Sequence, residues 1–162
     1  MDSNYLGVLD LKELPEGWRW SCLGDLIDQT RGICYGIVQP GKHDPEGTPM
    51  LNSQDIVSGT EIGEISFRVS NDIHSKYKRS TIRGGEVLLT LVGANFGQVG
   101  IAPDHAIGSN CSRAVGIVPV ETNSLFVSYC LRGPICRHFM DNWANTTAQP
   151  TFNLKDVANL PI

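Results

Sequence analysis

The stretch that decides the fold is Gly84-Gly85-Glu86-Val87-Leu88-Leu89-Thr90-Leu91-Val92, and it is followed by Gly93-Ala94-Asn95-Phe96-Gly97. An apolar run of this length between glycine turns is typical of a buried β-strand. We therefore expect a strand over 86–92 and a tight loop directly after it. Further strands are expected over 98–102 and 114–119, because both segments are short, apolar and bounded by turn residues.

The N-terminal half predicts shorter elements. Extended segments are expected over 48–52 and 61–69, where apolar residues lie between turn-forming residues. A short helix is expected over 22–29 after Ser21, and another over 72–79 after Asn71, since Ser and Asn are common N-cap residues.

The C-terminal part predicts a pair of helices. The first begins at Asn123 or Ser124 and ends at Gly133-Pro134, and the second covers about 135–143. An order with strands first and a helical pair late predicts an α+β fold. We expect a single domain with a curved, mostly antiparallel sheet and a few short helices, with the 124–142 helices packed on the sheet.

Length and composition fit one globular domain: 162 residues, of which 41% are hydrophobic and 19% charged. Residues 1–13 lack strong periodicity and are expected to be a mobile leader, so the domain is assigned to 14–162. No apolar run reaches the roughly 18 residues that a membrane span needs. The acidic, polar N-terminus is not a secretory signal peptide, and we expect no membrane partner.

The cysteines and histidines give no metal-binding pattern. The cysteine count is five, no C-x-x-C pair occurs, and the four histidines are scattered. Reduced cysteines in a cytoplasmic protein are therefore favoured over a disulfide scaffold or a zinc site.

Motifs of the common enzyme classes are also absent, including the Walker A loop, G-x-G-x-x-G, H-E-x-x-H and G-x-S-x-G. The glycine-rich stretch 93–100 leads into a strand rather than a helix, which favours a turn between strands over a phosphate-binding loop. We expect no catalytic residue, no metal and no cofactor in this chain.

The charge is unevenly distributed. The net charge of −4, taken alone, argues against nucleic acid as a partner. Residues 68–83, however, carry five basic residues against the single acid Asp72. Such a segment is commonly a solvated helix face, but beside polar loops it suits contact with phosphates. The candidate phosphate clamp consists of Lys76, Lys78, Arg79 and Arg83.

Several loops carry amide, Arg, Lys and Tyr side chains, which match base edges or phosphates. Each one alone is commonly a solvated loop residue, and their recurrence in several loops favours DNA reading. We expect the clamp to face the same side as the Asn95–Gln98 and Asn145–Gln149 loops. The loop candidates are Tyr35, Gln39, Lys42, Asn52, Gln54, Asn95, Gln98, Asn110, Arg113, Asn145 and Gln149.

Phe96 is a further candidate because it lies at the tip of a glycine loop. Two interpretations stay open: the ring contacts DNA, or it folds back on the core. Trp18, Trp20 and Trp143 are expected in the core.

Six short segments, in this order, carry a family resemblance. They are Leu14-Pro15-Glu16-Gly17-Trp18 with Leu23-Gly24-Asp25, Thr48-Pro49-Met50-Leu51 with Asp55-Ile56, Tyr77-Lys78-Arg79-Ser80, Gly84-Gly85-Glu86-Val87-Leu88, Gly93-Ala94 with Gly97 and Gly100, and Gln149-Pro150-Thr151-Phe152-Asn153 through Leu160-Pro161-Ile162. Each segment is weakly specific, but together they resemble the target recognition domain of a type I restriction–modification DNA specificity subunit.

The resemblance implies a sequence-specific module that binds double-stranded DNA and reads one part of a split site. It implies that separate modification (methyltransferase) and restriction subunits do the chemistry, in the cytoplasm. In this family the domain leads into a long spacer helix, so the chain is either a piece of a longer subunit or one half of a split one. One mild departure is Glu86, where the family usually has Asp.

The main alternative is a β-rich protein- or carbohydrate-interaction domain without DNA binding. Such a domain would show an apolar or aromatic groove and no basic surface. A small enzyme would instead need a cleft with a perturbed acid, base or nucleophile.

Overall fold

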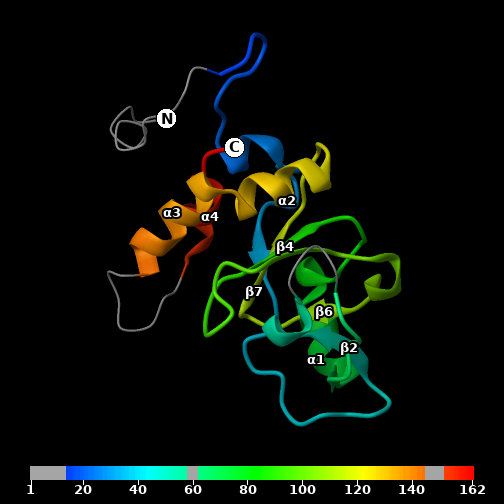
Figure 1. Cartoon of the computed structure of the whole chain (residues 1–162). Helices are drawn as coiled ribbons and strands as arrows, with labels where there is room; N and C mark the ends of the chain where they lie inside the picture. Colours follow the sequence, from blue (N-terminus) through cyan, green and yellow to red (C-terminus); the bar gives the residue numbers. More distant parts are fainter. Residues whose placement is uncertain (1–13, 58–61, 145–151) are drawn as a thin grey trace.

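The computed structural model describes residues 14–57, 62–144 and 152–162. In this part of the chain, a four-stranded sheet and a three-stranded sheet lie next to each other and are covered by short helices (Figure 1). Nearly all neighbouring strands are antiparallel, so the α+β fold with a mostly antiparallel sheet is confirmed.

The four-stranded sheet contains the strand that was expected at the centre of the chain. Its order is β1 (Cys34–Tyr35), β7 (Val115–Val118), β4 (Val87–Thr90) and β5 (Val99–Ile101), and all its pairs are antiparallel. Every residue of β4 is buried. Because β4 lies in the middle of a sheet that is covered on both faces, its sequence is a continuous apolar run.

Successive side chains of β4 enter two different hydrophobic clusters, because neighbouring residues of a strand point to opposite faces. Val87 and Leu89 pack with Val127, Met140 and Val157 from the C-terminal helices. The other face carries Leu88, which packs in the cluster under the second sheet. The expected packing of the 124–142 helices on the sheet is therefore confirmed.

The second sheet has the order β3 (Arg68–Val69), β2 (Thr48–Leu51) and β6 (Asn110–Cys111). The first half of β2 pairs with β3 in antiparallel fashion, and its second half pairs with β6 in parallel. Each edge strand therefore needs only two residues.

Gly36 makes the junction between the two sheets possible. The N–H of Ile37 donates to the carbonyl of Cys111 (2.7 Å), and Ile37 pairs with Ser112 in a parallel bridge. A Cβ on Gly36 would lie 1.8 Å from the carbonyl oxygen of Cys111. Only glycine lets the chain leave β1 this close to β6.

The described residues contain helices near both ends of the molecule. In Figure 1, α2, α3 and α4 lie at one end together with the C-terminus, and α1 lies at the other end beside β2 and β6. The bounds are α1 Asn71–Lys76, α2 Ser124–Arg132, α3 Pro134–Ala144 and α4 Leu154–Ala158, with 3-10 turns at Leu23–Leu26, Ser53–Asp55, Lys78–Ser80 and Asp104–Ala106.

The expected strands near 48–52, 86–92, 98–102 and 114–119 are confirmed within a residue or two. The strand expected over 61–69 is wrong for most of its length. Only Arg68–Val69 forms a strand, because β2 offers it just two residues, and Ile62 makes an isolated bridge to Ile56. Residue 61 lies outside the described residues.

The helix expected over 22–29 is also wrong, since only a 3-10 turn forms there. The N–H of Ser21 donates to the carbonyl of Ile162 (2.8 Å), and that of Leu23 donates to Leu160 (2.9 Å). This pairing with the C-terminal segment keeps the backbone extended where the helix was expected to start. The cap position falls on Cys22 instead of Ser21.

The helix expected over 72–79 is divided into two pieces. Ser70 caps α1 by accepting the N–H of Ile73, and α1 ends at Lys76. Tyr77 leaves the helical conformation, and a separate 3-10 turn follows over Lys78–Ser80. At the C-terminal side, the Asn123 cap and the break at Gly133-Pro134 are confirmed.

Trp18 corrects the expectation that the tryptophans lie in the core. Its side chain is 57% exposed and packs edge-on against Phe126, with ring centroids 5.8 Å apart. Trp20 is half-buried. The turn at Pro15–Gly17 carries Trp18 over the surface of α2 rather than under it.

Candidate functional site

Several loops meet at the end of the four-stranded sheet where β1 and β4 finish, and we call this surface the loop end. Because β1 and β4 are both antiparallel to β7, they finish on the same side. Tyr35 lies opposite Gly116 and Thr90 lies opposite Val115, so their last residues pair with neighbouring positions of β7. The loop end consists of residues 35–39, 52–55, 91–98 and 112–114.

Main-chain hydrogen bonds join these segments. The N–H of Arg113 donates to the carbonyl of Ile37 (2.9 Å). The N–H of Ser112 donates to the carbonyl of Leu51 (2.9 Å), directly before the 52–55 segment. Loops that are far apart in the sequence are thereby fixed to one another.

The 91–98 segment is joined to its neighbours on two sides. The N–H of Leu91 donates to the carbonyl of Ala114 (2.7 Å). The side-chain Nδ2 of Asn95 donates to the carbonyl of Ser53 (3.3 Å). One role of Asn95 is therefore to connect this loop to the 3-10 turn that carries Gln54.

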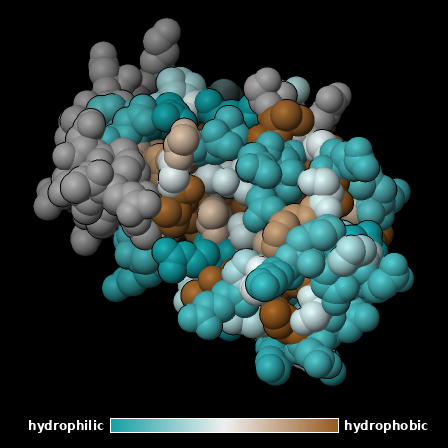
Figure 2. All heavy atoms as spheres, turned by 90° about the horizontal axis from the view of Figure 1, so that it is seen from below, coloured by the Kyte–Doolittle hydropathy of each residue, from teal (hydrophilic) through white to brown (hydrophobic). Residues whose placement is uncertain are grey.

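The side chains of the loop end differ in exposure. Gln39, Gln54 and Arg113 are exposed, and Tyr35 is 50% exposed. Asn52 is half-buried. Figure 2 views the molecule from the side on which α1, β2 and β6 lie in Figure 1, and this face is mostly hydrophilic with separate hydrophobic patches. Such a surface suits a polar ligand.

Gln98 is half-buried, and its Oε1 is a buried atom without a hydrogen-bond partner among the described residues. Its main-chain carbonyl accepts the N–H of Thr90 (2.8 Å), and Thr90 Oγ1 is likewise buried without a partner among these residues. A buried polar atom left unpaired costs about 1–3 kcal/mol. Gln98 would therefore gain from a new donor.

Asp55 places an acid in the loop end. Its Oδ2 accepts the main-chain N–H of Asn52 (2.6 Å) and so fixes the 3-10 turn over Ser53–Asp55. Burial raises the pKa of the Asp55 carboxyl, and the hydrogen bond from Asn52 opposes this. The Asp55 carboxylate therefore stabilises the local 3-10 turn.

Phe96 folds back on the core. Its ring packs edge-on against Phe152, with centroids 5.8 Å apart, and it is half-buried against the cluster of Leu89 and Met140. Of the two interpretations left open by the sequence, this geometry favours the core. Phe96 anchors the loop that presents Asn95 and Gln98.

The basic residues lie beside the opposite edge of the sheet from the Asn95–Gln98 loop. Lys78 and Arg79 lie in the turn next to β1, where Cys34 Sγ is 3.5 Å from the carbonyl oxygen of Arg79. The Asn95–Gln98 loop leads into β5, at the other edge. Three strand spacings, about 14 Å, separate the two edges.

Lys76 and Lys42 are both exposed. Lys76 ends α1. Lys42 follows Gly41, and a Cβ on Gly41 would lie 3.2 Å from Cδ1 of Ile73 in α1. The loop that carries Lys42 therefore passes next to α1.

Arg83 corrects the expected clamp. It precedes β4 whereas Asn95–Gln98 follows it, so the two lie at opposite ends of that strand. The expectation of one common surface is therefore wrong for Arg83, because the turn over 81–86 carries it away. It is also wrong for the guanidinium of Arg79, which lies over Gly32, before β1 begins and so at the opposite end of that strand from the loop end. Asn145 and Gln149 lie outside the described residues.

Asn110 is not a surface residue. It is fully buried, and its side chain contacts Ser80, His74 and the carbonyl of Tyr77. The expectation that it reads DNA is wrong, because these bonds use it to join β6 to α1 and the following turn.

An apolar cavity of about 450 Å³ lies at the other end of the molecule, lined by residues that include Trp18, Phe126 and Ile162. The interaction-domain alternative predicts such a groove. It also predicts no basic surface, whereas Lys78 and Arg79 are exposed. The groove alone therefore does not decide between DNA binding and protein or carbohydrate binding.

The described ranges contain no helix that is long and apolar enough to span a membrane. Within the same ranges, no group of three or more His, Cys, Asp or Glu side chains is placed to bind a metal ion.

Among curated proteins, the chain is similar to the type I restriction enzyme EcoBI specificity subunit of Escherichia coli, with 32% identity over 149 residues. The aligned part covers 90% of this chain. The chain belongs to the type I restriction enzyme specificity-subunit family. It spans about a third of the length of that relative, 31%. No family model matches the chain.

Solved structures of this family share the fold of the chain. The S subunit of a type I restriction–modification system from M. genitalium is 17% identical with a TM-score of 0.55, and the HsdS subunit from Thermoanaerobacter tengcongensis is 21% identical with a TM-score of 0.61. A chain from a structure of type I R-M complex assembly and conformational transition is 20% identical with a TM-score of 0.63. Each alignment covers 93% of this chain and 34–36% of the other.

Proposed function

We propose that the chain is a sequence-specific DNA-binding module that reads one part of a split site for a type I restriction–modification system. The observation that carries this proposal is the loop end, where hydrogen-bonded loops from separate parts of the chain present Gln39, Gln54 and Arg113 on one surface. The specificity-subunit relative supports the same function.

The side chains of the loop end have the chemistry for reading bases. The amides of Gln39 and Gln54 offer a donor and an acceptor, which matches N6 and N7 of adenine in the major groove. The guanidinium of Arg113 matches O6 and N7 of guanine. Gln98 would join them if the loop shifts and gives its unpaired Oε1 a donor.

The basic residues are suited to the phosphates beside the groove. The two edges of the four-stranded sheet lie about 14 Å apart by strand spacing, which is close to the width of the major groove, about 12 Å. The exposed basic residues of the chain, Lys42, Lys76, Lys78 and Arg79, are the candidates for contact with the DNA backbone. Phosphate contacts fix the register and carry no sequence information themselves.

The partners follow from this role. Double-stranded DNA is the direct partner, and the modification and restriction subunits are the partners of the intact specificity subunit. The chain supplies specificity and does no chemistry, so it uses no cofactor. The location that suits a reader of cellular DNA is the cytoplasm.

Arg113→Ala tests the base-reading role, with Arg132→Ala as the matched control. Each change removes one exposed arginine, but Arg132 lies on α2, where it contacts Tyr129. The measurement is the affinity for a set of duplexes that differ at single base pairs, at low salt. Removal of one bidentate hydrogen-bonded pair relaxes discrimination at one position by about 1–3 kcal/mol, roughly 5- to 150-fold.

Arg132→Ala is expected to leave the preference among duplexes unchanged. Equal and sequence-independent decreases in affinity from both variants would contradict base reading by Arg113. They would show that both arginines only add non-specific electrostatic attraction to DNA.

A further inference from the structure

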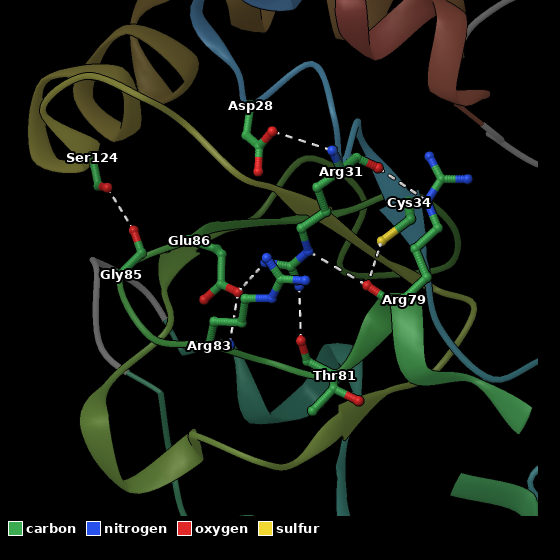
Figure 3. A network of polar contacts seen from close by, with 9 residues as sticks. All are labelled: Asp28, Arg31, Cys34, Arg79, Thr81, Arg83, Gly85, Glu86 and Ser124. Carbon is green, nitrogen blue, oxygen red and sulfur yellow. Dashed lines mark hydrogen bonds and ion pairs between the residues drawn. The ribbon is translucent and has the colours of Figure 1, made fainter. Parts of the chain in front are cut away.

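Arg31 is buried beneath the basic segment, with a relative exposure of only 6%. Figure 3 shows its guanidinium pointing toward residues 79–86. Nη2 donates to the carbonyl of Thr81 (2.8 Å), and Nε makes a longer contact with the carbonyl of Arg79 (3.4 Å). One buried side chain therefore holds two backbone carbonyls of the segment that carries the exposed cations.

Glu86 completes this anchor. Its Oε1 accepts Nη1 of Arg31 in an ion pair in which both side chains are 4% exposed. The same oxygen accepts the main-chain N–H of Arg83 (2.7 Å). The backbone of residues 79–83 is thus fixed at three positions by a single buried pair (Figure 3).

Arg79 is also oriented by this contact. Its Nε donates to the carbonyl of Arg31 (3.0 Å), so the two arginines each donate to the other's carbonyl. The guanidinium of Arg79 lies over Gly32, where a Cβ would be 3.0 Å from Nη2. The charge of Arg79 is therefore exposed but not free to point in any direction.

Stability alone is a poor explanation for this pair. Removing two charges from water commonly costs as much as their attraction returns, and apolar replacements of buried ion pairs are often neutral or stabilising. The second oxygen of Glu86 is buried without a partner among the described residues, which adds to this cost. The geometry that the pair fixes is a better reason for its presence.

We propose that Arg31 and Glu86 are positioning residues that fix the 78–83 segment so that Lys78 and Arg79 meet DNA phosphates at set places. This inference rests on the proposed DNA binding. It adds that a buried pair, which touches no DNA, controls the electrostatic part of the affinity.

The test compares the salt dependence of duplex binding in whole-chain variants. The double variant R31M/E86M removes both charges without leaving one unpaired. The variant K78Q/R79Q removes the cations themselves. R132M/E121M is the control, because Arg132 and Glu121 are both exposed and lie outside the loop end and the 78–83 segment, and their removal also leaves the net charge unchanged.

The plot of log affinity against log salt has a negative slope, and the magnitude of this slope decreases by about 0.9 for each DNA phosphate that the protein no longer neutralises. We expect K78Q/R79Q to reduce the slope by about 2, and R31M/E86M to reduce it similarly while the chain stays folded by circular dichroism. Combining both sets should give no further reduction. The control should keep the wild-type slope.

Arg31→Lys keeps a charge beside Glu86 but lacks the planar fork that reaches the carbonyls of Thr81 and Arg79. It should lower the slope as well, which keeps the test valid if the double variant unfolds. A wild-type slope in folded R31M/E86M or R31K overturns the positioning role. Failure of the wild-type chain to bind duplex DNA overturns the proposed function, and the positioning role with it.

Discussion

At the scale of single residues, Gly36 is the position with the least room for change. Its Cα faces the carbonyl of Cys111 at the junction of the two sheets, and the 35–39 part of the loop end depends on this close approach. The conformation of Gly36 is not the reason, since its φ is not positive. The constraint is the space that a Cβ would need.

Gly36→Ala should lower the free energy of unfolding by at least about 2 kcal/mol, because backbone must move to admit the Cβ. Gly63→Ala is the control, since its Cβ would lie 3.6 Å from the nearest atom, the carbonyl oxygen of Asp55. Urea denaturation measures both. A midpoint for Gly36→Ala equal to that of the control would contradict the close approach.

The buried thiols give a second test at this scale. Burial raises the pKa of Cys136 to about 12, and it also raises the pKa of Cys111. Because the thiolate is the reactive form, native-state alkylation at pH 8 should label the half-exposed Cys22 and Cys130 before these two. Mass spectrometry of the labelled peptides measures the order, with the urea-unfolded chain as the control. Fast labelling of Cys111 in the folded chain would contradict its burial.

Residue type and loop position were enough to predict that Gln39, Gln54 and Arg113 are exposed, but no local pattern could predict Arg31. Its partner Glu86 is 55 positions away, and in the sequence Glu86 differs from the resembled family only in having Glu in place of Asp. The prediction that Asn110 reads DNA was wrong for the same reason. Its amide suits a base edge, but the side chain is buried and contacts protein groups instead. Residue type and local pattern do not predict which residues distant in the sequence pack against each other.

At the scale of elements, α4 depends on its cap because it is only five residues long. Oδ1 of Asn153 accepts the N–H groups of Lys155 (2.9 Å) and Asp156 (3.0 Å). The helix places Val157 in the main hydrophobic cluster. The cap therefore connects a local hydrogen bond to the packing of the C-terminal segment.

Asn153→Ala should lower the free energy of unfolding by about 1 kcal/mol, the usual cost of removing an N-cap acceptor. Asn159→Ala is the matched control, since this exposed asparagine follows the last turn of the same helix. Thermal unfolding measures the difference. Equal melting temperatures for both variants would contradict the capping role.

The elements with strong local signals could be predicted from the sequence, including β4 from its apolar run and α2 from its Asn123 cap and Gly133-Pro134 end. β1 and β6 could not, because each has two residues and exists only through its partner strand. The 3-10 turn at Leu23–Leu26 differed from the expected helix for a related reason, its pairing with the C-terminal segment.

At the scale of the whole molecule, the two ends differ in chemistry. The loop end presents the exposed polar side chains of Gln39, Gln54 and Arg113, whereas an apolar groove is lined by Trp18 and Ile162, near the C-terminus. The net charge of −4 opposes the approach of DNA, while the local basic residues favour it. Binding is therefore expected to depend on a few contacts rather than on general attraction.

The isolated chain should bind duplex DNA weakly, with a Kd on the order of micromolar or weaker at physiological salt. It makes only the contacts of one module, and added salt displaces its phosphate contacts. Fluorescence anisotropy between low and physiological salt measures this. A nanomolar Kd that does not change with salt would contradict weak binding through a few phosphate contacts.

Selection from a randomised duplex pool at low salt tests most directly whether the loop end reads base sequence. The wild-type chain is compared with Gln39→Ala/Gln54→Ala/Arg113→Ala and with the control Arg132→Ala. We predict that the wild type and the control enrich the same short motif, and that the triple variant no longer enriches it or enriches a different one. A flat pool from the wild type, or the same motif from the triple variant, would contradict the claim.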